Sequence, residues 1–222
     1  RGVVVGDTMN KNDAMNKSDG TNLHDTLRLD DAVANAAAVL RAGGAAVFPT
    51  DTVYGLGVAV NSCVSPQQLF AIKRRDQGKP VAWLVGGVDD LDKYGKDVPA
   101  WARAAAAQHW PGALTLIVRA SSAVPAAFQS AQGTIGLRMP NSDVALSLIR
   151  AVGTPLATTS ANISGAPAPS RDAQLDAELL KQADAVVRGI DCVGGEGVAS
   201  TVVDCTGEHP VVLRQGSITI TE

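Results

Sequence analysis

One short segment, residues 48–57, carries an unusual number of groups that can contact a ligand. Its sequence is FPTDTVYGLG, with two threonines, a carboxylate, a tyrosine and two glycines where a turn needs only one or two such residues. Hydroxyls of Thr50, Thr52 and Tyr54 could meet where glycine lets the backbone come close to a ligand. A strand end followed by an elaborate turn explains the same residues equally well. This segment alone therefore leaves both interpretations open.

Cationic side chains and one small polar turn stand at the ends of other predicted elements. They are Lys73 and Arg75 after a helix, Arg138 and Arg214 after strands, and the turn SANIS at residues 160–164. Such a turn can offer donors to an anion, and guanidinium groups suit phosphate. Each feature alone is equally well explained by a helix dipole, a solvated charge or a capping turn. Together, several cations without a cluster of acidic metal ligands favour a phosphate-bearing ligand.

The elements that must position these residues are irregularly mixed along the chain. The patterns predict a helix capped by Asp30 or Asp31 and ended by Gly43–Gly44, and another opened by a capping box at Ser65 and Gln68. Further helices are predicted at residues 99–109, 143–152 and 174–183. Predicted strands lie at residues 27–29, 45–48, 81–85, 114–118, 134–138, 155–159, 185–187, 200–204, 211–214 and 217–220. Without strict βαβ alternation, the predicted fold class is α+β, with helices flanking a twisted, largely antiparallel or mixed sheet.

Composition limits the classes of protein. A chain of 222 residues with a net charge of −3 can bury one sizeable core and has no global basic field for nucleic acid. The three cysteines are far apart and lack CxxC spacing, which argues against a disulfide framework or a zinc site and predicts a cytoplasmic protein without a membrane span. Residues 1–22 lack any period and are predicted to be a disordered N-terminal tail, followed by a single domain at residues 23–222.

Seven motifs together resemble the signature of the YrdC-like family. They are PTDTVYGLG at 49–57, KRR at 73–75, WPGALT at 110–115, LRMP at 137–140, SAN at 160–162, STVVD at 200–204 and LRQG at 213–216. Any single motif would be weak, but they occur in family order from about residue 25 to 218. Within that family the chain is similar to the short, stand-alone threonylcarbamoyl-AMP synthases. Because it ends soon after the last motif, we expect it to lack the extra C-terminal domain of longer relatives.

The resemblance implies a YrdC-like fold with a large, positively charged central cavity. It also implies a nucleotidyltransferase that condenses L-threonine, bicarbonate or CO2, and ATP into threonylcarbamoyl-adenylate and pyrophosphate, with Mg²⁺ accompanying ATP. The product would pass to a separate transferase complex that makes N6-threonylcarbamoyladenosine at position 37 of tRNA. These partners and this cofactor are expectations from family likeness.

The same resemblance assigns roles to particular residues. The threonine-contacting positions are Thr52, Arg138, Thr158 and Ser200. The ATP-contacting positions are Arg75, Lys79, Thr134, Ser160 and Arg214. The family's KxR and SxN motifs supply the catalytic set Lys73, Arg75, Ser160 and Asn162. No dedicated general base stands out, so catalysis is expected to rest on positioning and electrostatics. No residue is implied as a metal ligand.

Four positions depart from the family pattern, and two other functions stay open. Lys79, Leu84, Ala168 and Ala199 replace the family's asparagine, histidine, serine and glutamate, which alters individual contacts with nucleotide and threonine. One alternative is an RNA-binding module with a weak contact to tRNA or double-stranded RNA, although the acidic net charge argues against strong general binding. The other is a carbamoyl-AMP-forming enzyme with a different substrate, whose known examples are longer and carry cysteine motifs that this chain lacks.

Overall fold

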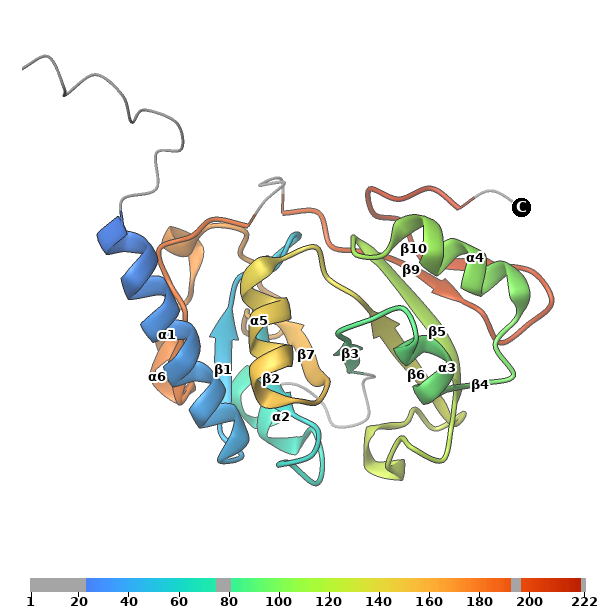
Figure 1. The fold of residues 1–222 in the computed structure, drawn as a ribbon, viewed down its shortest axis with the longest axis horizontal. Coiled ribbons are helices and arrows are strands. Elements are labelled where there is room, and N and C mark those ends of the chain that lie inside the picture. Colours follow the sequence, from blue (N-terminus) through green and yellow to red (C-terminus); the bar gives the residue numbers. More distant parts are fainter. Residues whose placement is uncertain (1–22, 75–80, 193–196, 221–222) are drawn as a thin grey trace, which may run out of the picture.

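The computed structural model describes residues 23–74, 81–192 and 197–220 (Figure 1). The predicted tail at residues 1–22 lies outside the described residues, and so do the predicted site residues Arg75 and Lys79. All structural statements below concern the described part of the chain.

Helices and strands follow one another in the mixed order that the sequence predicts. The helices are α1 (Leu23–Arg41), α2 (Gln67–Lys73), α3 (Asp90–Tyr94), α4 (Ala100–His109), α5 (Asp143–Val152) and α6 (Ala177–Gln182), with 3-10 turns η1 (Ala126–Phe128) and η2 (Asp172–Gln174). The strands are β1 (Ala45–Phe48), β2 (Gly55–Ala59), β3 (Ala82–Leu84), β4 (Gly95–Lys96), β5 (Leu114–Ala120), β6 (Thr134–Arg138), β7 (Leu156–Ser160), β8 (Ala185–Val186), β9 (Thr201–Asp204) and β10 (Val211–Arg214).

All the described strands belong to one mixed sheet. Its order is β10-β9-β5-β6-β3-β7-β2-β1-β8, and β4 pairs with β5 beside this path. The pairs β1–β8, β3–β6 and β5–β9 are parallel, whereas the remaining neighbours are antiparallel. The α+β class with a mixed sheet is therefore confirmed. Strands β9 and β10 lie at the opposite end of the sheet from α1 and α6 (Figure 1).

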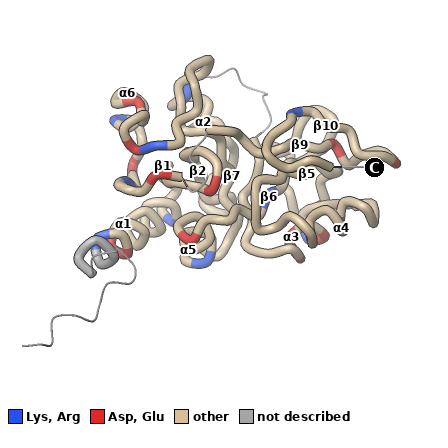
Figure 2. The backbone as a smooth tube through the Cα atoms, turned by 90° about the horizontal axis from the view of Figure 1, so that it is seen from above, with Lys and Arg blue, Asp and Glu red and all other residues tan. Residues whose placement is uncertain are grey.

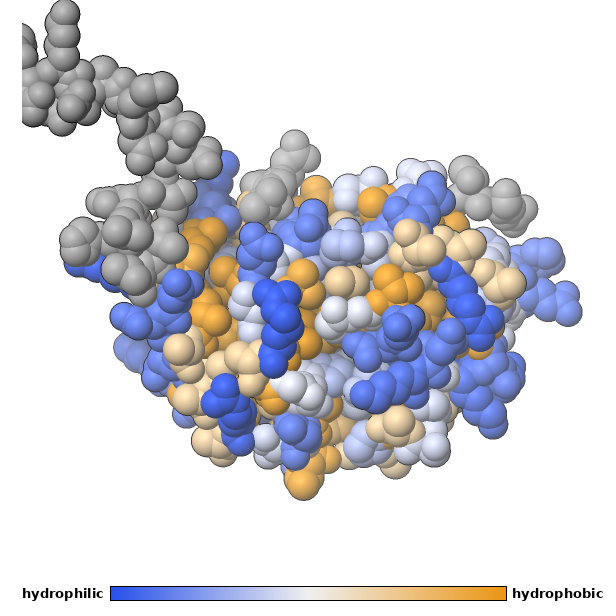
Figure 3. Space-filling model, in the orientation of Figure 1, coloured by the Kyte–Doolittle hydropathy of each residue, from blue (hydrophilic) through white to orange (hydrophobic). Residues whose placement is uncertain are grey.

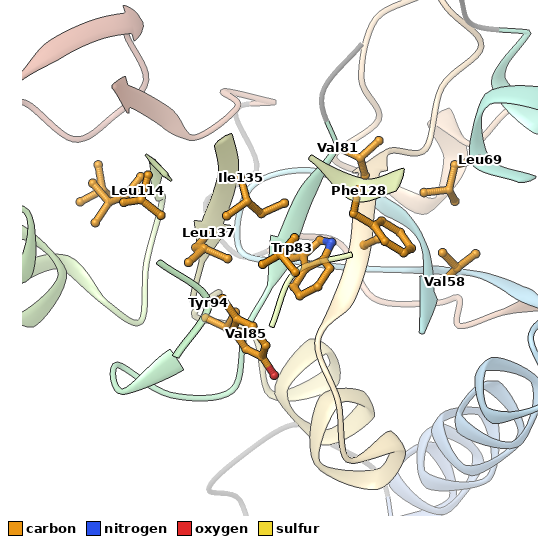
Figure 4. Close-up of a cluster of buried hydrophobic side chains, with 14 of the residues drawn as sticks. Val58, Leu69, Val81, Trp83, Val85, Tyr94, Leu114, Phe128, Ile135 and Leu137 are labelled. Carbon is orange, nitrogen blue, oxygen red and sulfur yellow. The ribbon is translucent and has the colours of Figure 1, made fainter. Parts of the chain in front are cut away.

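Apolar side chains on the two faces of the sheet form two cores. Along β1, Ala46 and Phe48 join the core made with α1 and α5, which lie side by side over this half of the sheet (Figure 1), while Ala45 and Val47 join the larger core. Trp83 lies at the centre of the larger core, with edge-to-face contacts to Tyr94 and Phe128 at ring-centroid distances of 5.2 and 5.5 Å (Figure 4). Such ring pairs stabilise a core beyond the area that they bury.

Helix α5 has the bounds that its caps predict. The hydroxyl of Ser142 accepts a hydrogen bond from the Ala145 backbone nitrogen at 3.3 Å, and Gly153 ends the helix with a φ of 77°. Only glycine adopts this left-handed conformation without strain. Val144, Leu148 and Val152 are buried against α1 and the sheet, as their spacing predicts.

The strand predicted at residues 27–29 and the helix cap at Asp30 or Asp31 are wrong. Helix α1 begins at Leu23 and runs through both sites to Arg41. Leu29 extends the stripe of Val33, Ala36 and Leu40 that faces the core made with α1 and α5. Two leucines separated by one residue are too short a pattern to distinguish a strand from a helix. The helical spacing that continues through Leu40 decides the structure.

The capping box predicted for α2 is also wrong. The helix has Pro66 as its N-cap residue, without a side-chain cap. Gln68 instead donates to the Asp184 carboxylate at 3.3 Å. The backbone carbonyl of Ser65 accepts from the Cys63 thiol. The hydrogen bond from Gln68 to the distant Asp184 therefore takes the place of the local capping bond that the sequence predicted.

The predicted strand at residues 217–220 is absent from the described sheet. The buried Thr201 hydroxyl donates to the Ile218 carbonyl at 2.6 Å and accepts from the Gly216 and Ile218 nitrogens. One side chain thus satisfies backbone groups that a strand would pair with a neighbour. The helix predicted at 174–183 also divides into η2 and α6, because Asp176 caps α6 by accepting from the Glu178 and Leu179 nitrogens.

Polar residues cover most of the outer surface that can be seen. On the face drawn in Figure 3, hydrophilic side chains alternate with small apolar areas over the helices. Figure 2 shows most charged positions on the outer helices and loops rather than in the middle of the sheet. Within the described residues, no helix has the length and apolar character that a membrane crossing requires.

Candidate functional site

A cavity of about 500 Å³ opens on the sheet where residues of β2, β3, β5, β6 and β7 face the segment before β9. Its described lining includes the cations Arg138 and Arg214 but no aspartate or glutamate. Many hydroxyls share the same wall, from Thr50, Thr52, Thr115, Thr134, Thr158, Thr159, Ser160 and Ser200. Cations without facing carboxylates, surrounded by neutral donors, make this wall suitable for an anionic ligand.

Most of the predicted site residues meet in this cavity, although they are distant in sequence. The lining contains Thr52, Thr134, Arg138, Thr158, Ser160, Asn162, Ser200 and Arg214. Lys73 is hydrogen-bonded to the wall but is not part of the described lining. Arg75 and Lys79 lie outside the described residues. The structure thus brings the predicted groups together, and their individual roles stay predictions.

The hydroxyl-rich segment after β1 divides its side chains between turn and cavity. Thr50 Oγ1 donates to the Val53 carbonyl at 2.6 Å and accepts from the Thr52 nitrogen at 3.2 Å. These bonds form a side-chain turn of the kind that threonine favours. Thr50 therefore shapes the turn, and the turn presents Thr52.

Tyr54 and Gly55 both line the cavity, and each also has a structural role. The Tyr54 hydroxyl donates to the Ile190 carbonyl, and burial raises the pKa of this phenol. At Gly55, a Cβ would lie 2.8 Å from Thr158 Cγ2. This glycine therefore permits close packing of β2 on the Thr158 side chain of β7.

Arg138, at the end of β6, is a buried cation with several partners. Its Nη2 donates to the Asp51 carboxylate, its Nη1 to Thr52 Oγ1 at 3.0 Å and its Nε to the Gly112 carbonyl at 3.0 Å. Burial lowers the pKa of Arg138, the neighbouring Asp51 raises it, and Arg214 lowers it further. Arg214 therefore lies close enough in the same cavity to affect the Arg138 guanidinium.

Arg214, at the end of β10, contacts the wall through one residue. Its Nε donates to the Ser200 carbonyl at 2.9 Å and its Nη2 to Ser200 Oγ at 3.1 Å. Ser200 Oγ also lies 2.8 Å from Thr115 Oγ1, so a chain of polar groups joins β5 to β10. Burial lowers the pKa of Arg214 as well. After this residue, Gly216 is tightly enclosed: a Cβ there would lie 2.4 Å from the Ala199 carbonyl oxygen.

Lys73 holds the turn that contains Ser160 and Asn162. The side chain is buried, and its ammonium donates to the Ser160 carbonyl and to Asn162 Oδ1 at 3.1 Å. In turn, the Asn162 amide donates to the Ala166 carbonyl at 2.7 Å, and the Ser164 nitrogen donates to the Lys73 carbonyl at 3.0 Å. The KxR lysine and the SxN turn therefore form one hydrogen-bonded unit.

Three of the four departures from the family pattern lie on the cavity wall. Leu84, Ala168 and Ala199 are part of the described lining, while Lys79 lies outside the described residues. Leu84 is also buried in the core beside α5. Apolar side chains at these positions reduce the number of polar contacts available to a ligand there.

Asp51 and Thr115 are the functional candidates that sequence reasoning missed. Asp51 belongs to the first motif but was given no role, and Thr115 ends the WPGALT motif. Thr115 and Ile117 share the cavity face of β5 because side chains two residues apart in a strand point the same way. That period was visible in the sequence, whereas the pairing of Asp51 with Arg138 was not.

Comparison with known proteins assigns the chain to a family. The family described as "Telomere recombination", Sua5–YciO–YrdC, matches residues 38–216. The chain belongs to this family. Among Sua5–YciO–YrdC relatives, the threonylcarbamoyl-AMP synthase of Bacillus subtilis is 35% identical over 188 residues, which cover 84% of this chain and 54% of that protein. The putative threonylcarbamoyl-AMP synthase of Mycobacterium tuberculosis strain H37Rv is 38% identical over 187 residues, which cover 84% of both chains.

A solved Sua5–YciO–YrdC structure supports the same assignment. Pyrococcus abyssi Sua5 complexed with L-threonine aligns with a TM-score of 0.77 and 34% identity, covering 83% of this chain and 54% of that one. This chain therefore spans about half the length of the Bacillus and Pyrococcus relatives that it matches.

Proposed function

We propose that this chain is a threonylcarbamoyl-AMP synthase, which joins L-threonine, CO2 from bicarbonate, and ATP into threonylcarbamoyl-adenylate and pyrophosphate. The observation that carries the proposal is that the predicted threonine set and the described members of the predicted ATP set line one cationic cavity. Relatives named for this activity and a relative solved with L-threonine support it. We further propose that residues 23–222 form a single catalytic domain.

Threonine is assigned to the part of the cavity that contains Arg138. Its carboxylate requires a cation, which Arg138 provides, and its hydroxyl and ammonium require the neutral oxygens of Thr52, Thr158 and Ser200. These four residues come from four separate segments that the sheet brings to one wall. The apolar neighbour Leu84 leaves the threonine methyl group a surface to contact.

ATP is assigned to the part of the cavity lined by Ser160 at the end of β7, Arg214 at the end of β10 and Thr134 on β6, which lies between those two strands in the sheet order. The hydroxyl and backbone groups of the turn after β7 offer neutral donors to phosphate oxygens. Arg214 offers a guanidinium to the same anion. Arg75 and Lys79 are proposed to add charge from the segment after α2, which lies outside the described residues.

The reaction needs one new carbon–nitrogen bond and one exchange at phosphorus. The threonine ammonium first loses one proton to solvent, and the free amine nitrogen bonds to the carbon of CO2 as one carbon–oxygen π bond breaks. Loss of a second nitrogen-bound proton to solvent leaves a carbamate anion. A carbamate oxygen then attacks the α-phosphorus, and the bond from this phosphorus to the bridging oxygen of the β-phosphate breaks. Pyrophosphate leaves with that electron pair. The protein contributes by holding both reactants and by offering cations to the phosphate charge.

Mg²⁺ is proposed to arrive with ATP as its counter-ion. Among the described residues, no group of three or more histidine, cysteine, aspartate or glutamate side chains is placed to hold a metal. The described part of the cavity lining likewise contains no aspartate or glutamate. Mg²⁺ commonly binds through substrate phosphates and water with few protein ligands, so this donor set fits a metal that belongs to the nucleotide.

The product would serve a tRNA threonylcarbamoyl-transferase complex in the cytoplasm, because a mixed anhydride of a carbamate and a phosphate is reactive and needs an acceptor. A direct contact with tRNA stays a weaker expectation. Figure 2 shows lysine and arginine positions interspersed with aspartate and glutamate positions along the described backbone, and strong RNA binding depends on concentrated positive charge.

The test is mass spectrometry of products together with a pyrophosphate assay. Incubation with ATP, Mg²⁺, threonine and bicarbonate should give threonylcarbamoyl-adenylate, and omission of threonine or bicarbonate should stop pyrophosphate release. Serine should be a poorer substrate, because loss of one methyl group from a shaped pocket costs roughly 1–3 kcal/mol. Pyrophosphate release that is indifferent to threonine would contradict the proposal and favour a carbamoyl-adenylate-forming enzyme with another substrate.

A further inference from the structure

The buried ion pair of Asp51 and Arg138 has only one member on the cavity wall. Arg138 is part of the lining, whereas Asp51 is absent from the described lining. Both side chains are deeply buried, with 9% of Asp51 and 8% of Arg138 exposed. Asp51 therefore contacts Arg138 without belonging to the described cavity lining.

The Arg138 guanidinium is held at all three of its nitrogens. Asp51 accepts from Nη2, Thr52 from Nη1 and the Gly112 carbonyl from Nε. A guanidinium carries five N–H donors, two on each terminal nitrogen. Within the described residues, these three bonds therefore leave one N–H on each terminal nitrogen. Because the planar group is fixed at three points, each of these two remaining N–H groups keeps a constant direction.

The Gly112 carbonyl is itself fixed in place. Gly112 donates its backbone N–H to the Met139 carbonyl at 2.8 Å, one residue after Arg138. The other two partners, Asp51 and Thr52, are adjacent in the turn that the Thr50 hydroxyl shapes. Two loops from different parts of the chain therefore clamp one side chain.

We propose that Asp51 is a positioning residue, which fixes the Arg138 guanidinium in the orientation that binds the carboxylate of the amino-acid substrate. The inference rests on the proposed function, in which Arg138 contacts threonine. Asp51 itself does not touch the substrate. Its effect on the reaction passes entirely through Arg138.

Two other accounts of the pair make different predictions. If Asp51 acted only through its charge, it would repel an anionic ligand, and its neutralisation would tighten carboxylate binding. If it served only the fold, its loss would lower the melting temperature and leave substrate binding unchanged. A buried ion pair is by itself weak grounds for stability. Positioning predicts instead that neutralising Asp51 weakens threonine binding.

The first experiment compares Asp51→Asn with wild type in steady-state kinetics. Asparagine keeps the shape and one acceptor oxygen but removes the charge. We expect KM for threonine to rise about 10-fold or more, as for loss of a charge-assisted bond, while KM for ATP stays within about 2-fold. Asp51→Glu, which restores the carboxylate, should recover part of the loss. Asp92→Asn is the matched control, because Asp92 pairs with Arg103 at 2.9 Å on the surface.

The second experiment repeats the substitution in an Arg138→Gln background. The double variant contains no buried charge at this pair, so it tests the proposal even where Asp51→Asn alone fails to fold. We expect Asp51→Asn to change kcat/KM for threonine by less than about 2-fold in this background, since two residues that act through one contact are not additive.

Three outcomes would overturn the proposal. One is a KM for threonine that is unchanged or lower in a folded Asp51→Asn variant. Another is a further loss in the Arg138→Gln background, which would mean that Asp51 contacts the substrate itself. The third is an equal rise in KM for ATP and for threonine, which would indicate a general structural defect. Wild-type protein without threonine-dependent pyrophosphate release would contradict the proposed function instead, and the two failures are thereby distinguishable.

Discussion

Arg138 and Arg214 line the same cavity but are held in different ways. Arg138 is buried on β6, with a carboxylate, a hydroxyl and a carbonyl as partners from three residues. Arg214 is partly exposed on the edge strand β10, with its guanidinium half-buried against the wall, and its described partners are the carbonyl and hydroxyl of Ser200. A cation fixed by several elements suits a ligand group of constant position.

The difference between the two arginines matches the two halves of the proposed reaction. Threonine has one carboxylate, which stays attached throughout, and a rigid cation can serve it. ATP enters with a triphosphate and loses pyrophosphate, so its charges move during turnover. An exposed arginine on an edge strand can follow them, because fewer contacts restrain it. The comparison therefore predicts that substitutions at the two sites will differ in kind as well as in size.

The largest effect should come from Arg138→Gln. We expect threonine-dependent turnover to fall by about 100-fold or more, as for loss of a preorganised charged donor. Because Asp51 is then left buried without its partner, unfolding free energy should fall by roughly 3–5 kcal/mol. Urea unfolding and initial-rate assays measure the two quantities. A stable and active Arg138→Gln variant would show that Arg138 is not the rigid, essential cation that distinguishes it from Arg214.

Arg214→Gln should have a smaller effect of another kind. We expect kcat/KM for ATP to fall roughly 10-fold, consistent with loss of one charged hydrogen bond, with little change in the melting temperature. Since Arg214 is the more exposed, wild-type KM for ATP should also rise more steeply with ionic strength than KM for threonine does. Equal salt dependence of both constants would remove the distinction between a fixed and an adjustable cation.

Thr115→Val tests the polar chain that connects β5 to Arg214. Valine keeps the shape and removes the hydroxyl that lies 2.8 Å from Ser200 Oγ. We expect a loss of about 1 kcal/mol, or roughly 5-fold, in kcat/KM for ATP, the value of one neutral hydrogen bond. Thr206→Val, whose hydroxyl bonds only within its own turn to Asp204, is the control, and it should leave kinetics unchanged.

The smallest effect concerns an exposed pair, Asp172 with Arg188 at 2.9 Å. Hydrogen bonding from Arg188 lowers the pKa of Asp172 below its ordinary 3.8. The pair therefore stabilises the fold above that pH, and the contribution is lost as pH falls through the lowered value. Asp172→Asn should leave stability at pH 7 nearly unchanged and slightly reduce its loss on acidification, as followed by thermal melts between pH 7 and 3. A large loss of stability at pH 7 would show that this exposed pair matters to the fold as much as the buried pair of Asp51 and Arg138.

Local signals in the sequence predicted much of the framework. Strand β6, helix α5 and the terminating Gly153 follow from periodicity and caps that act within a few residues. Errors occur where a distant partner intervenes, as when Gln68 binds Asp184 rather than closing a cap. The same applies at residues 217–220, where the Thr201 hydroxyl takes the place of a neighbouring strand.

The site was predicted as a set of residues but not as an arrangement. Family resemblance named Thr52, Arg138 and Ser200, and the cavity contains all three. Neither composition nor spacing could show that Asp51 pairs with Arg138, since the two are 87 residues apart in sequence. The placement of Lys73 behind the Ser160 turn rather than on the wall likewise depends on how α2 meets β7.

The order of strands along the chain has a consequence for synthesis on the ribosome. Strands β9 and β10 are made after all other described strands, yet β9 inserts next to β5, whose residues emerge far earlier. The turn with Thr52 and the strand with Arg138 leave the ribosome first, and Ser200 and Arg214 complete the cavity later. A growing chain therefore contains Arg138 before Arg214. Until β9 pairs with β5, the backbone N–H and C=O groups along that edge of β5 stay unpaired and can bind another strand wrongly.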